Sequence, residues 1–198
     1  MDYKVLVTLM FAAILVNNYI LRQFLGVCPF LGVSKDMKGA VGMSAAIIFV
    51  MLLATAVTWP VQKYLLDRNN LGYLQTIVFI LIIATLVQIV EIVLKKYIPS
   101  LYKILGIYLP LMTTNCAIFA VSIVNIKNDL TYIEALVNAL GSGIGIFLGM
   151  VIFSSIREHT ENADPPEAFK GLPLTLISAA ILSFSFFGFN GVMENLFR

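Results

Sequence analysis

The sequence predicts an all-α integral membrane protein of six transmembrane helices, arranged as two inverted three-helix halves with broken helices at its two cysteines. Composition is the first observation behind this prediction, because 60% of the 198 residues are hydrophobic and only 12% are charged. Soluble domains contain about 45–50% apolar and about 25% charged residues. A soluble fold of this length cannot bury so much apolar surface, so the bilayer is the expected solvent. The net charge of +2 also gives no basic field for binding nucleic acid.

The spacing between charged residues predicts the individual spans, since a helix that crosses the bilayer needs about 20 mostly apolar residues. Five uncharged stretches of 22 to 24 residues meet this requirement, and they occupy residues 39–62, 69–90, 104–126, 135–156 and 171–193. The first of them is expected to end near Trp59-Pro60. A sixth stretch, residues 5–21, can cross the membrane if Arg22 extends its side chain to the interface. We expect it to be a retained span, because Asn17-Asn18-Tyr19 does not resemble the small-residue cleavage site of a signal peptide.

Residues 23–34 form one more apolar stretch, which has 12 residues and is too short to cross. A half-helix or re-entrant segment is expected here. Such a segment is tolerated at membrane depth where other parts of the protein cover it.

Lysine and arginine residues set the expected orientation, because cytoplasmic loops carry an excess of them. With six spans, one face holds Lys4, Lys63, Arg68, Lys127 and Arg198. The other face holds Arg22, Lys35, Lys38, Lys95, Lys96, Lys103, Arg157 and Lys170. The second face is expected to be cytoplasmic, which places both termini outside. The expected cytoplasmic face also contains the longest polar stretch, residues 157–170. We expect this stretch to be a loop that can dock a partner subunit.

The two cysteines occupy similar places in the two halves of a single domain, residues 1–198. Each is followed by an apolar hexamer, in Cys28-Pro29-Phe30-Leu31-Gly32-Val33 and in Cys116-Ala117-Ile118-Phe119-Ala120-Val121. Two halves with three spans each, at about residues 1–98 and 99–198, would be inverted relative to one another. Helix-breaking residues accompany both hexamers, with Gly26 and Pro29 around Cys28, and Pro110 and Asn115 before Cys116. Interrupted segments at matching places in two such halves point to a site near the membrane midplane.

Two matched cysteines suggest a metal centre, because thiolates are soft ligands that suit iron–sulfur clusters, zinc and Cu(I). An iron–sulfur cluster usually takes four thiolates, so a second chain would have to supply two of them. Broken helices at the cysteines would offer backbone N–H groups to the sulfur atoms. The alternative is plain packing, since free cysteine is a common small core residue. No Ser-His-Asp constellation, H-E-x-x-H or dinucleotide-binding fingerprint indicates a soluble enzyme.

The segments around both cysteines resemble one known family. The first segment runs from Asn17-Asn18-Tyr19-Ile20-Leu21 through Phe24-Leu25-Gly26-Val27-Cys28-Pro29-Phe30-Leu31-Gly32-Val33-Ser34-Lys35. The second segment reads Leu105-Gly106-Ile107-Tyr108-Leu109-Pro110-Leu111-Met112-Thr113-Thr114-Asn115-Cys116-Ala117. Together they resemble the small membrane subunits of the Rnf complex and of the sodium-pumping NADH:quinone oxidoreductase. The resemblance extends over nearly the whole chain, and the cysteine motifs look more like the Rnf branch of the family.

This resemblance implies a fold and a function. Members have six spans in two inverted halves and pair with a homologous six-helix subunit of opposite topology in a bacterial cytoplasmic (inner) membrane. The four cysteines of such a pair hold an iron–sulfur cluster, expected to be [2Fe–2S], so Cys28 and Cys116 would be metal ligands. The neighbouring candidate cofactor-binding residues are Gly26, Pro29, Thr114 and Asn115.

In such a complex the cluster relays electrons between the other membrane, flavin and iron–sulfur subunits, and electron flow between ferredoxin and NAD is coupled to Na⁺ or H⁺ transport. This chain would then be non-catalytic alone but part of a translocating oxidoreductase.

Other polar residues within the expected spans allow two interpretations each. Glu91 is a candidate for an ion path, because an intramembrane acid marks a functional site by default. Its position near the end of a span, four residues before Lys95, also fits an interfacial ion pair. Asn17 and Asn18 either bond neighbouring helices or orient the Cys28 segment. A small secondary transporter with an inverted repeat remains the alternative function, although a transporter has no need for two matched thiols.

Overall fold

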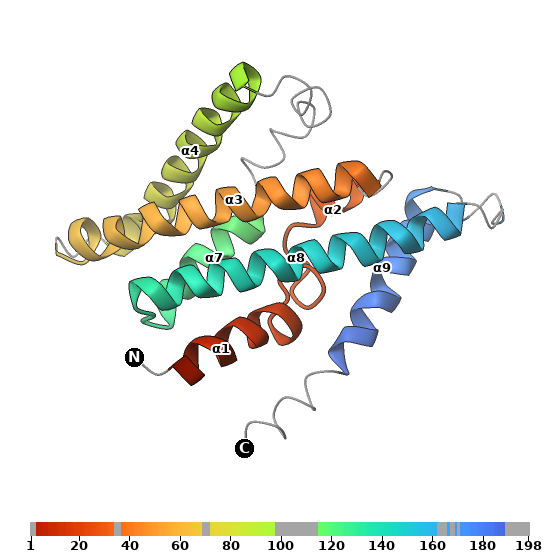
Figure 1. Ribbon diagram of the computed structural model, residues 1–198, viewed down its shortest axis with the longest axis horizontal. Coiled ribbons are helices and arrows are strands. Elements are labelled where there is room, and N and C mark those ends of the chain that lie inside the picture. Colours follow the sequence, from red (N-terminus) through yellow and green to blue (C-terminus); the bar gives the residue numbers. More distant parts are fainter. Residues whose placement is uncertain are drawn as a thin grey trace.

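The computed structural model describes residues 3–33, 37–68, 72–97, 115–161, 166, 169 and 171–188, and within these parts the regular structure is entirely helical (Figure 1). The elements before residue 98 are α1 (Tyr3–Phe11), the π-helix η1 (Ala12–Val16), α2 (Val27–Val33), α3 (Met37–Val61), the π-helix η2 (Gln62–Leu66), the 3₁₀ turn η3 (Gly72–Leu74) and α4 (Gln75–Tyr97). The later elements are α7 (Cys116–Lys127), α8 (Tyr132–Glu161) and α9 (Leu172–Phe187).

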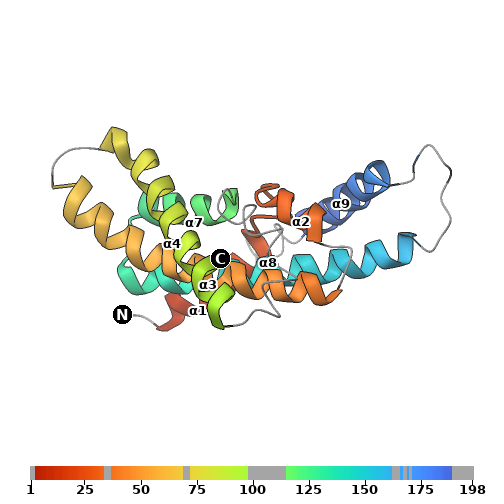
Figure 2. The same cartoon turned by 90° about the horizontal axis from the view of Figure 1, so that it is seen from above.

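The long helices α3 and α8 form the centre of the structure. They lie side by side and run in opposite directions, as both Figure 1 and Figure 2 show. Large side chains from both helices, including Met43, Ile47, Met150 and Phe153, are buried in one hydrophobic core. Glycines on α8 allow this close approach, because a Cβ at Gly143 would lie 2.8 Å from Ile48 Cγ1.

The shorter and outer helices surround this pair. The segment α1–η1 packs on α8, and α7 packs on α3. Helix α4 follows α3 and helix α9 follows α8, and Figure 1 shows each of them folding back at an angle from the end of its long partner. Large apolar side chains on α4 and α9 remain exposed, including Ile80, Leu81, Ile181 and Phe184. An apolar outer surface of this kind is expected where lipid replaces water.

The helices agree with the expected spans in part. Three are long and apolar enough to cross a membrane, and they are Gly39–Leu66, Gly72–Tyr97 and Tyr132–Thr160. Three shorter apolar helices lie at Leu6–Leu15, Cys116–Lys127 and Leu172–Phe187. These helices fit an integral membrane protein. Residues 98–114, which include most of the first half of the expected fourth span, are outside the described residues, so the six-span inverted arrangement stays a prediction.

Several boundaries differ from the sequence-based expectation. The first helix ends at Val16 instead of residue 21, and α4 continues to Tyr97 instead of ending at residue 90. The span expected at residues 39–62 does not end near Trp59-Pro60. Helix α3 passes Pro60 and continues through η2 to Leu66. Proline has no N–H to donate, and a π-helical turn directly after it lets the hydrogen-bond pattern shift without ending the helix. The expected loop at residues 157–170 is also shorter than predicted, since α8 extends through Arg157 to Glu161.

The tight packing of α8 on the first helix can be tested at Gly145. A Cβ there would lie 3.0 Å from the backbone oxygen of Ile14 and 3.2 Å from that of Ala13. Displacing backbone atoms costs free energy, so Gly145→Ala should lower the stability of the folded protein by about 1–3 kcal/mol. Thermal unfolding of the purified protein measures this effect. Gly149→Ala is the matched control, because its Cβ would meet only Leu21 side-chain atoms at 3.6 Å or more, and equal stability of the two variants would contradict the packing described here.

Candidate cysteine site

The first helix breaks after η1, and one asparagine organises the break. Asn18 is 1% exposed. Its Nδ2 donates to the carbonyl of Gly145 on α8 at 2.7 Å. Its Oδ1 accepts the N–H groups of Ile20 at 3.1 Å and Leu21 at 3.3 Å. The side chain therefore replaces backbone partners that a continuous helix would have supplied, and it attaches the turn to α8.

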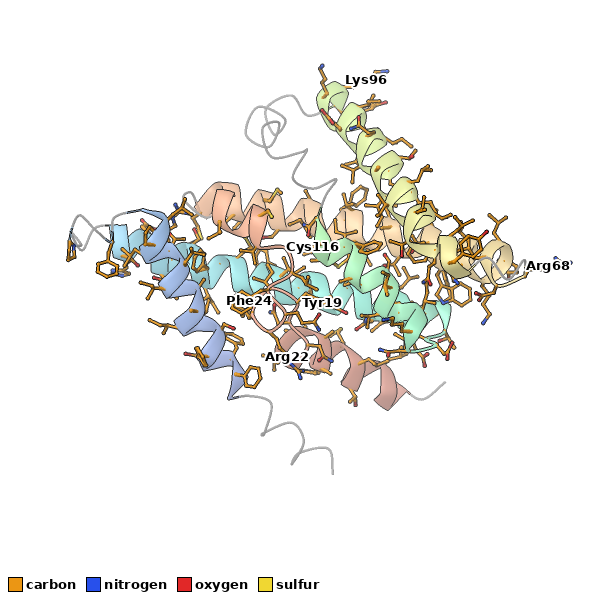
Figure 3. The ribbon with its side chains drawn as sticks, turned by 180° about the vertical axis from the view of Figure 1, so that it is seen from behind. Tyr19, Arg22, Phe24, Arg68, Lys96 and Cys116 are labelled. Atoms are coloured by element: carbon orange, nitrogen blue, oxygen red, sulfur yellow. The ribbon has the colours of Figure 1, made fainter. Side chains whose placement is uncertain are left out.

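The chain then turns through two residues with left-handed backbone conformations. Phe24 has φ +54° and Gly26 has φ +84°. This turn brings the Gly26 N–H to Cys116, and the N–H donates to Cys116 Sγ at 2.8 Å. Figure 3 shows Tyr19, Phe24 and Cys116 gathered near the middle of the molecule. Two segments 90 residues apart in sequence are thereby joined at a thiol.

Cys116 begins α7, and the preceding residue caps that helix. The side chain of Asn115 accepts the N–H of Ala117 at 3.0 Å, which is the usual role of an N-cap asparagine. A Cβ at Gly26 would lie 3.3 Å from both Asn115 Oδ1 and Ala117 Cβ. Glycine at position 26 therefore satisfies both the backbone angle and the narrow space against the start of α7.

Cys28 is the second residue of the short helix α2, which directly follows the turn. The half-helix expected within residues 23–34 is present as α2, which comprises the seven residues Val27–Val33. Arg157 of α8 holds the other end of α2, because its Nη1 donates to the carbonyl of Leu31 at 2.8 Å. This arginine is only 9% exposed, and a cation at the carbonyl end of a helix complements the unpaired C=O groups there.

The two thiols are free and reachable from outside the chain. The side chain of Cys28 is exposed and that of Cys116 is partly exposed. Within the described residues, no group of three or more His, Cys, Asp or Glu side chains is placed to hold a metal ion. Because the sequence has only two cysteines, a cluster held by four thiolates would need two more from another chain.

The structure brings together some of the predicted site residues. Gly26, Asn115 and Cys116 are in contact, and Cys28 is two residues beyond Gly26. Pro29 belongs to α2, but its side chain is outside the described part, as is Thr114. Glu91 is half-buried on α4 and is five residues before Lys96, which Figure 3 shows at the end of α4 that projects away from the other helices.

Arg157 is the residue that sequence reasoning missed, because it was assigned to the expected polar loop. The sequence feature that could have identified Arg157 is its position directly after the apolar stretch 135–156, where a helix can continue into the membrane interface. Nothing in the local sequence indicated its partner, which is 126 residues away.

A family model described as "Rnf-Nqr subunit, membrane protein" matches residues 6–193. The chain belongs to the Rnf-Nqr family.

Three similar relatives are each the subunit designated A of an oxidoreductase complex. The one from the Na⁺-translocating ferredoxin:NAD⁺ oxidoreductase complex of Acetobacterium woodii is 51% identical over 187 residues, which cover 94% of this chain and 97% of the relative. Its counterpart in the ion-translocating oxidoreductase complex of Syntrophotalea carbinolica is 46% identical over 96% of this chain and 98% of its own length. The counterpart in Pseudoalteromonas translucida is 44% identical over 95% of this chain and 97% of its own length.

These comparisons confirm the resemblance to the Rnf branch. The matched region contains both cysteines, the helix break at Asn18 and the arginine that holds the end of α2. The family description of a membrane protein agrees with the long apolar helices of the structure.

The helix break of this Rnf-Nqr protein can be tested with two neighbouring asparagines. Asn18→Ala would leave the Gly145 carbonyl and the N–H groups of Ile20 and Leu21 without their side-chain partner. We expect a loss of about 1–3 kcal/mol in stability, because unpaired buried polar groups keep their desolvation cost. The control is Asn17→Ala, since Asn17 is exposed and accepts a single exposed hydrogen bond from Arg22. Thermal unfolding of the purified protein should separate the variants, and an equal effect at both positions would refute the role of Asn18.

Proposed function

We propose that this chain is a membrane subunit of an ion-translocating ferredoxin:NAD⁺ oxidoreductase of the Rnf type. In this role Cys28 and Cys116 hold half of an intramembrane iron–sulfur cluster, expected to be [2Fe–2S]. The observation that carries the proposal is the hydrogen bond from Gly26 to Cys116 Sγ, which joins the two cysteine segments. The names of the relatives support the oxidoreductase assignment.

The donor set fits such a cluster. Both residues are soft sulfur ligands, both are free, and both are accessible to a second protein. A homologous six-helix subunit of opposite topology would supply the remaining two thiolates. The cluster, when bound, provides a one-electron carrier inside the bilayer.

The protein contributes orientation and electrostatics. The Gly26 N–H donates to Cys116 Sγ, and hydrogen bonds to cluster sulfurs favour the more negative, reduced state. Cys116 is also the first residue of α7, where the positive end of the helix dipole favours negative charge. Arg157 fixes the carbonyl end of α2 and so helps to hold Cys28 in position.

The inverted repeat is part of the same proposal. Its halves would be α1 to α4, within residues 1–98, and the segment from residue 99 through α9. The arrangement of the described helices supports it, because α2 precedes α3 as α7 precedes α8, and α3 and α8 are antiparallel. The helices α4 and α9 then fold back in corresponding ways (Figure 1). Inverted halves would place the two cysteines close to a common axis near the midplane.

A redox centre at that depth serves electron transfer across the membrane. The hydrocarbon layer is about 30 Å thick, and a centre near its middle divides the distance into two shorter steps. The electrons would pass between flavin and iron–sulfur subunits on the two sides of a bacterial inner membrane. Their flow would be coupled to movement of Na⁺ or H⁺, with both termini of this chain outside.

The decisive experiment compares the purified complex carrying Cys28→Ala or Cys116→Ala with the wild type. Each change should remove one cluster, measured as iron and acid-labile sulfide and as an electron paramagnetic resonance signal after reduction. Electron transfer from ferredoxin to NAD should fall by at least about a hundredfold, because metal ligation is lost.

The matched control is Ser185→Ala, which alters an exposed hydroxyl on α9 that bonds within its own helix. This variant should keep the iron content and the turnover of the wild type. If the cysteine variants assemble with unchanged iron, spectrum and turnover, the thiols are packing residues. A transporter function would then become the better hypothesis.

A further inference from the structure

An open groove lies on the surface of α3 and α8, and neither cysteine lines it. Its volume is about 460 Å³, within the range of about 300–1,000 Å³ that is usual for ligand pockets. Every residue that lines the groove is apolar, so its walls offer contact to hydrocarbon and not to a polar ligand. The lining includes Met10 of α1, Phe49, Leu52 and Ala56 of α3, and Leu136 and Leu140 of α8.

The groove lies within two segments that are long and apolar enough to span a membrane, Gly39–Leu66 and Tyr132–Thr160. Because α3 and α8 run in opposite directions, the end of α3 lies beside the start of α8 (Figure 1). Large lining side chains are also open to the surroundings, since Phe49 is 55% and Ile133 is 48% exposed. In a bilayer this groove would therefore open toward the acyl chains of the lipids.

Two aromatic residues lie at one end of the groove. Trp59 follows Ala56 by three residues on α3. Tyr132 directly precedes the lining residue Ile133 on α8. The Trp59 and Tyr132 rings meet edge to face with centroids 5.4 Å apart, and Trp59 Nε1 donates to the carbonyl of Leu130 at 2.9 Å. Since Trp and Tyr are enriched at the level of the lipid headgroups, we expect this end of the groove at that level.

A lysine at the same end can attract a lipid phosphate. Lys63 follows Ala56 by seven residues, a spacing that places both on one face of a helix. The lysine side chain is exposed, and its Nζ lies 5.1 Å from the centre of the Trp59 ring. Asp67 and Asp129 line a small pocket with Lys63, yet Lys63 forms no salt bridge with any residue that the structure describes. Its charge is therefore available to an anionic group at the membrane surface.

The length and width of the groove fit one acyl chain. Phe49 and Lys63 are separated by about 21 Å of helix, and one leaflet of hydrocarbon is about 15 Å thick. A chain whose headgroup lies near Lys63 thus passes Ala56 and ends near Phe49. The part from Phe49 to Ala56 is about 10 Å long, so a volume of about 460 Å³ gives a mean cross-section of about 45 Å². An α-helix, with a diameter of about 10–12 Å, has a cross-section of about 80 Å² or more and is too wide to enter.

We propose that this groove binds one phospholipid of the surrounding bilayer. One of its acyl chains packs along α3 from Ala56 to Phe49, and its phosphate lies at Lys63, beside Trp59. The chain would fill the space that Met10 of α1 borders, and flexible methionine side chains adapt well to such a ligand. The site involves neither cysteine, so it stands independently of the cluster proposal.

The test is native mass spectrometry of the purified full chain in detergent. The probes are dioleoyl phosphatidylglycerol and dioleoylglycerol, which have the same chains but differ in the phosphate-bearing headgroup. The wild type should bind one phosphatidylglycerol, and it should bind dioleoylglycerol about fivefold more weakly or worse because the phosphate contact is lost. Ala56→Phe should weaken phosphatidylglycerol binding by about tenfold or more, since the ring takes the space of buried methylene groups. The matched control is Ala84→Phe, which makes the same change at a half-buried alanine of α4 and should bind as the wild type.

A second pair of variants tests the headgroup. Lys63→Gln should weaken phosphatidylglycerol binding by about fivefold and leave dioleoylglycerol binding unchanged, because only the phosphate contact is removed. Lys127→Gln is its control, since it changes an exposed lysine at the end of α7, which does not line the groove. Cys28→Ala should keep the lipid binding of the wild type, which separates failure of this proposal from failure of the cluster.

Three outcomes would overturn the lipid site. In the first, Ala56→Phe binds phosphatidylglycerol as tightly as Ala84→Phe does. In the second, Ala56→Phe releases another membrane subunit from the purified complex while Lys63→Gln changes no lipid affinity, which shows that protein covers the groove. In the third, Lys63→Gln binds both probes as the wild type does, and this result decides the question if Ala56→Phe fails to fold.

Discussion

Backbone hydrogen bonding in an apolar environment is the constraint on which this structure depends. The chain leaves its first helix at Val16 and does not form another until Val27, in a region packed against the central helices. Lipid offers no partner for the freed N–H and C=O groups, so the protein has to supply them. Asn18 does this with one side chain, which serves both Gly145 on α8 and the turn that follows it. The bonds of Asn18 therefore couple the helix break to the packing of α8.

The close contact of α8 with its neighbours makes that coupling possible. Gly145 has no Cβ, so the backbone of the first helix approaches it at Ala13 and Ile14, and its carbonyl is within reach of Asn18. A second long-range bond, from Arg157 to Leu31, holds the end of α2 to the same helix. The short helix α2 has only seven residues and too few internal bonds to be stable alone. Its position is set by the turn before it and by α8.

The sequence predicted those features that follow from local physical requirements. Charged residues are costly inside a bilayer, so the gaps between them located α3, α4 and α8 well. The short helix within residues 23–34 was predicted for the same reason, because twelve apolar residues cannot cross. The helix end near Pro60 was wrong, since proline can be accommodated by a π-helical turn that no composition rule reports.

The cysteine site was predicted only as a set of residues. Gly26 and Asn115 were expected near the cysteines as helix breakers, but their contact depends on a left-handed turn and on segments 90 residues apart. Arg157 was placed in a loop because its partner, the carbonyl of Leu31, is invisible to local patterns. Residues that act through long-range contacts can be recognised only in the structure, whereas Cys28 and Cys116 are candidates because of their own chemistry.

The two cysteines are held in different ways, and this difference has a consequence for the proposed assembly. Cys116 accepts a hydrogen bond from its own chain and is partly covered, whereas Cys28 is exposed on a helix that depends on others for its position. If Cys28 is a ligand of the proposed cluster, a second protein has to cover it at that point. The partner subunit would therefore complete the environment of Cys28 more than that of Cys116.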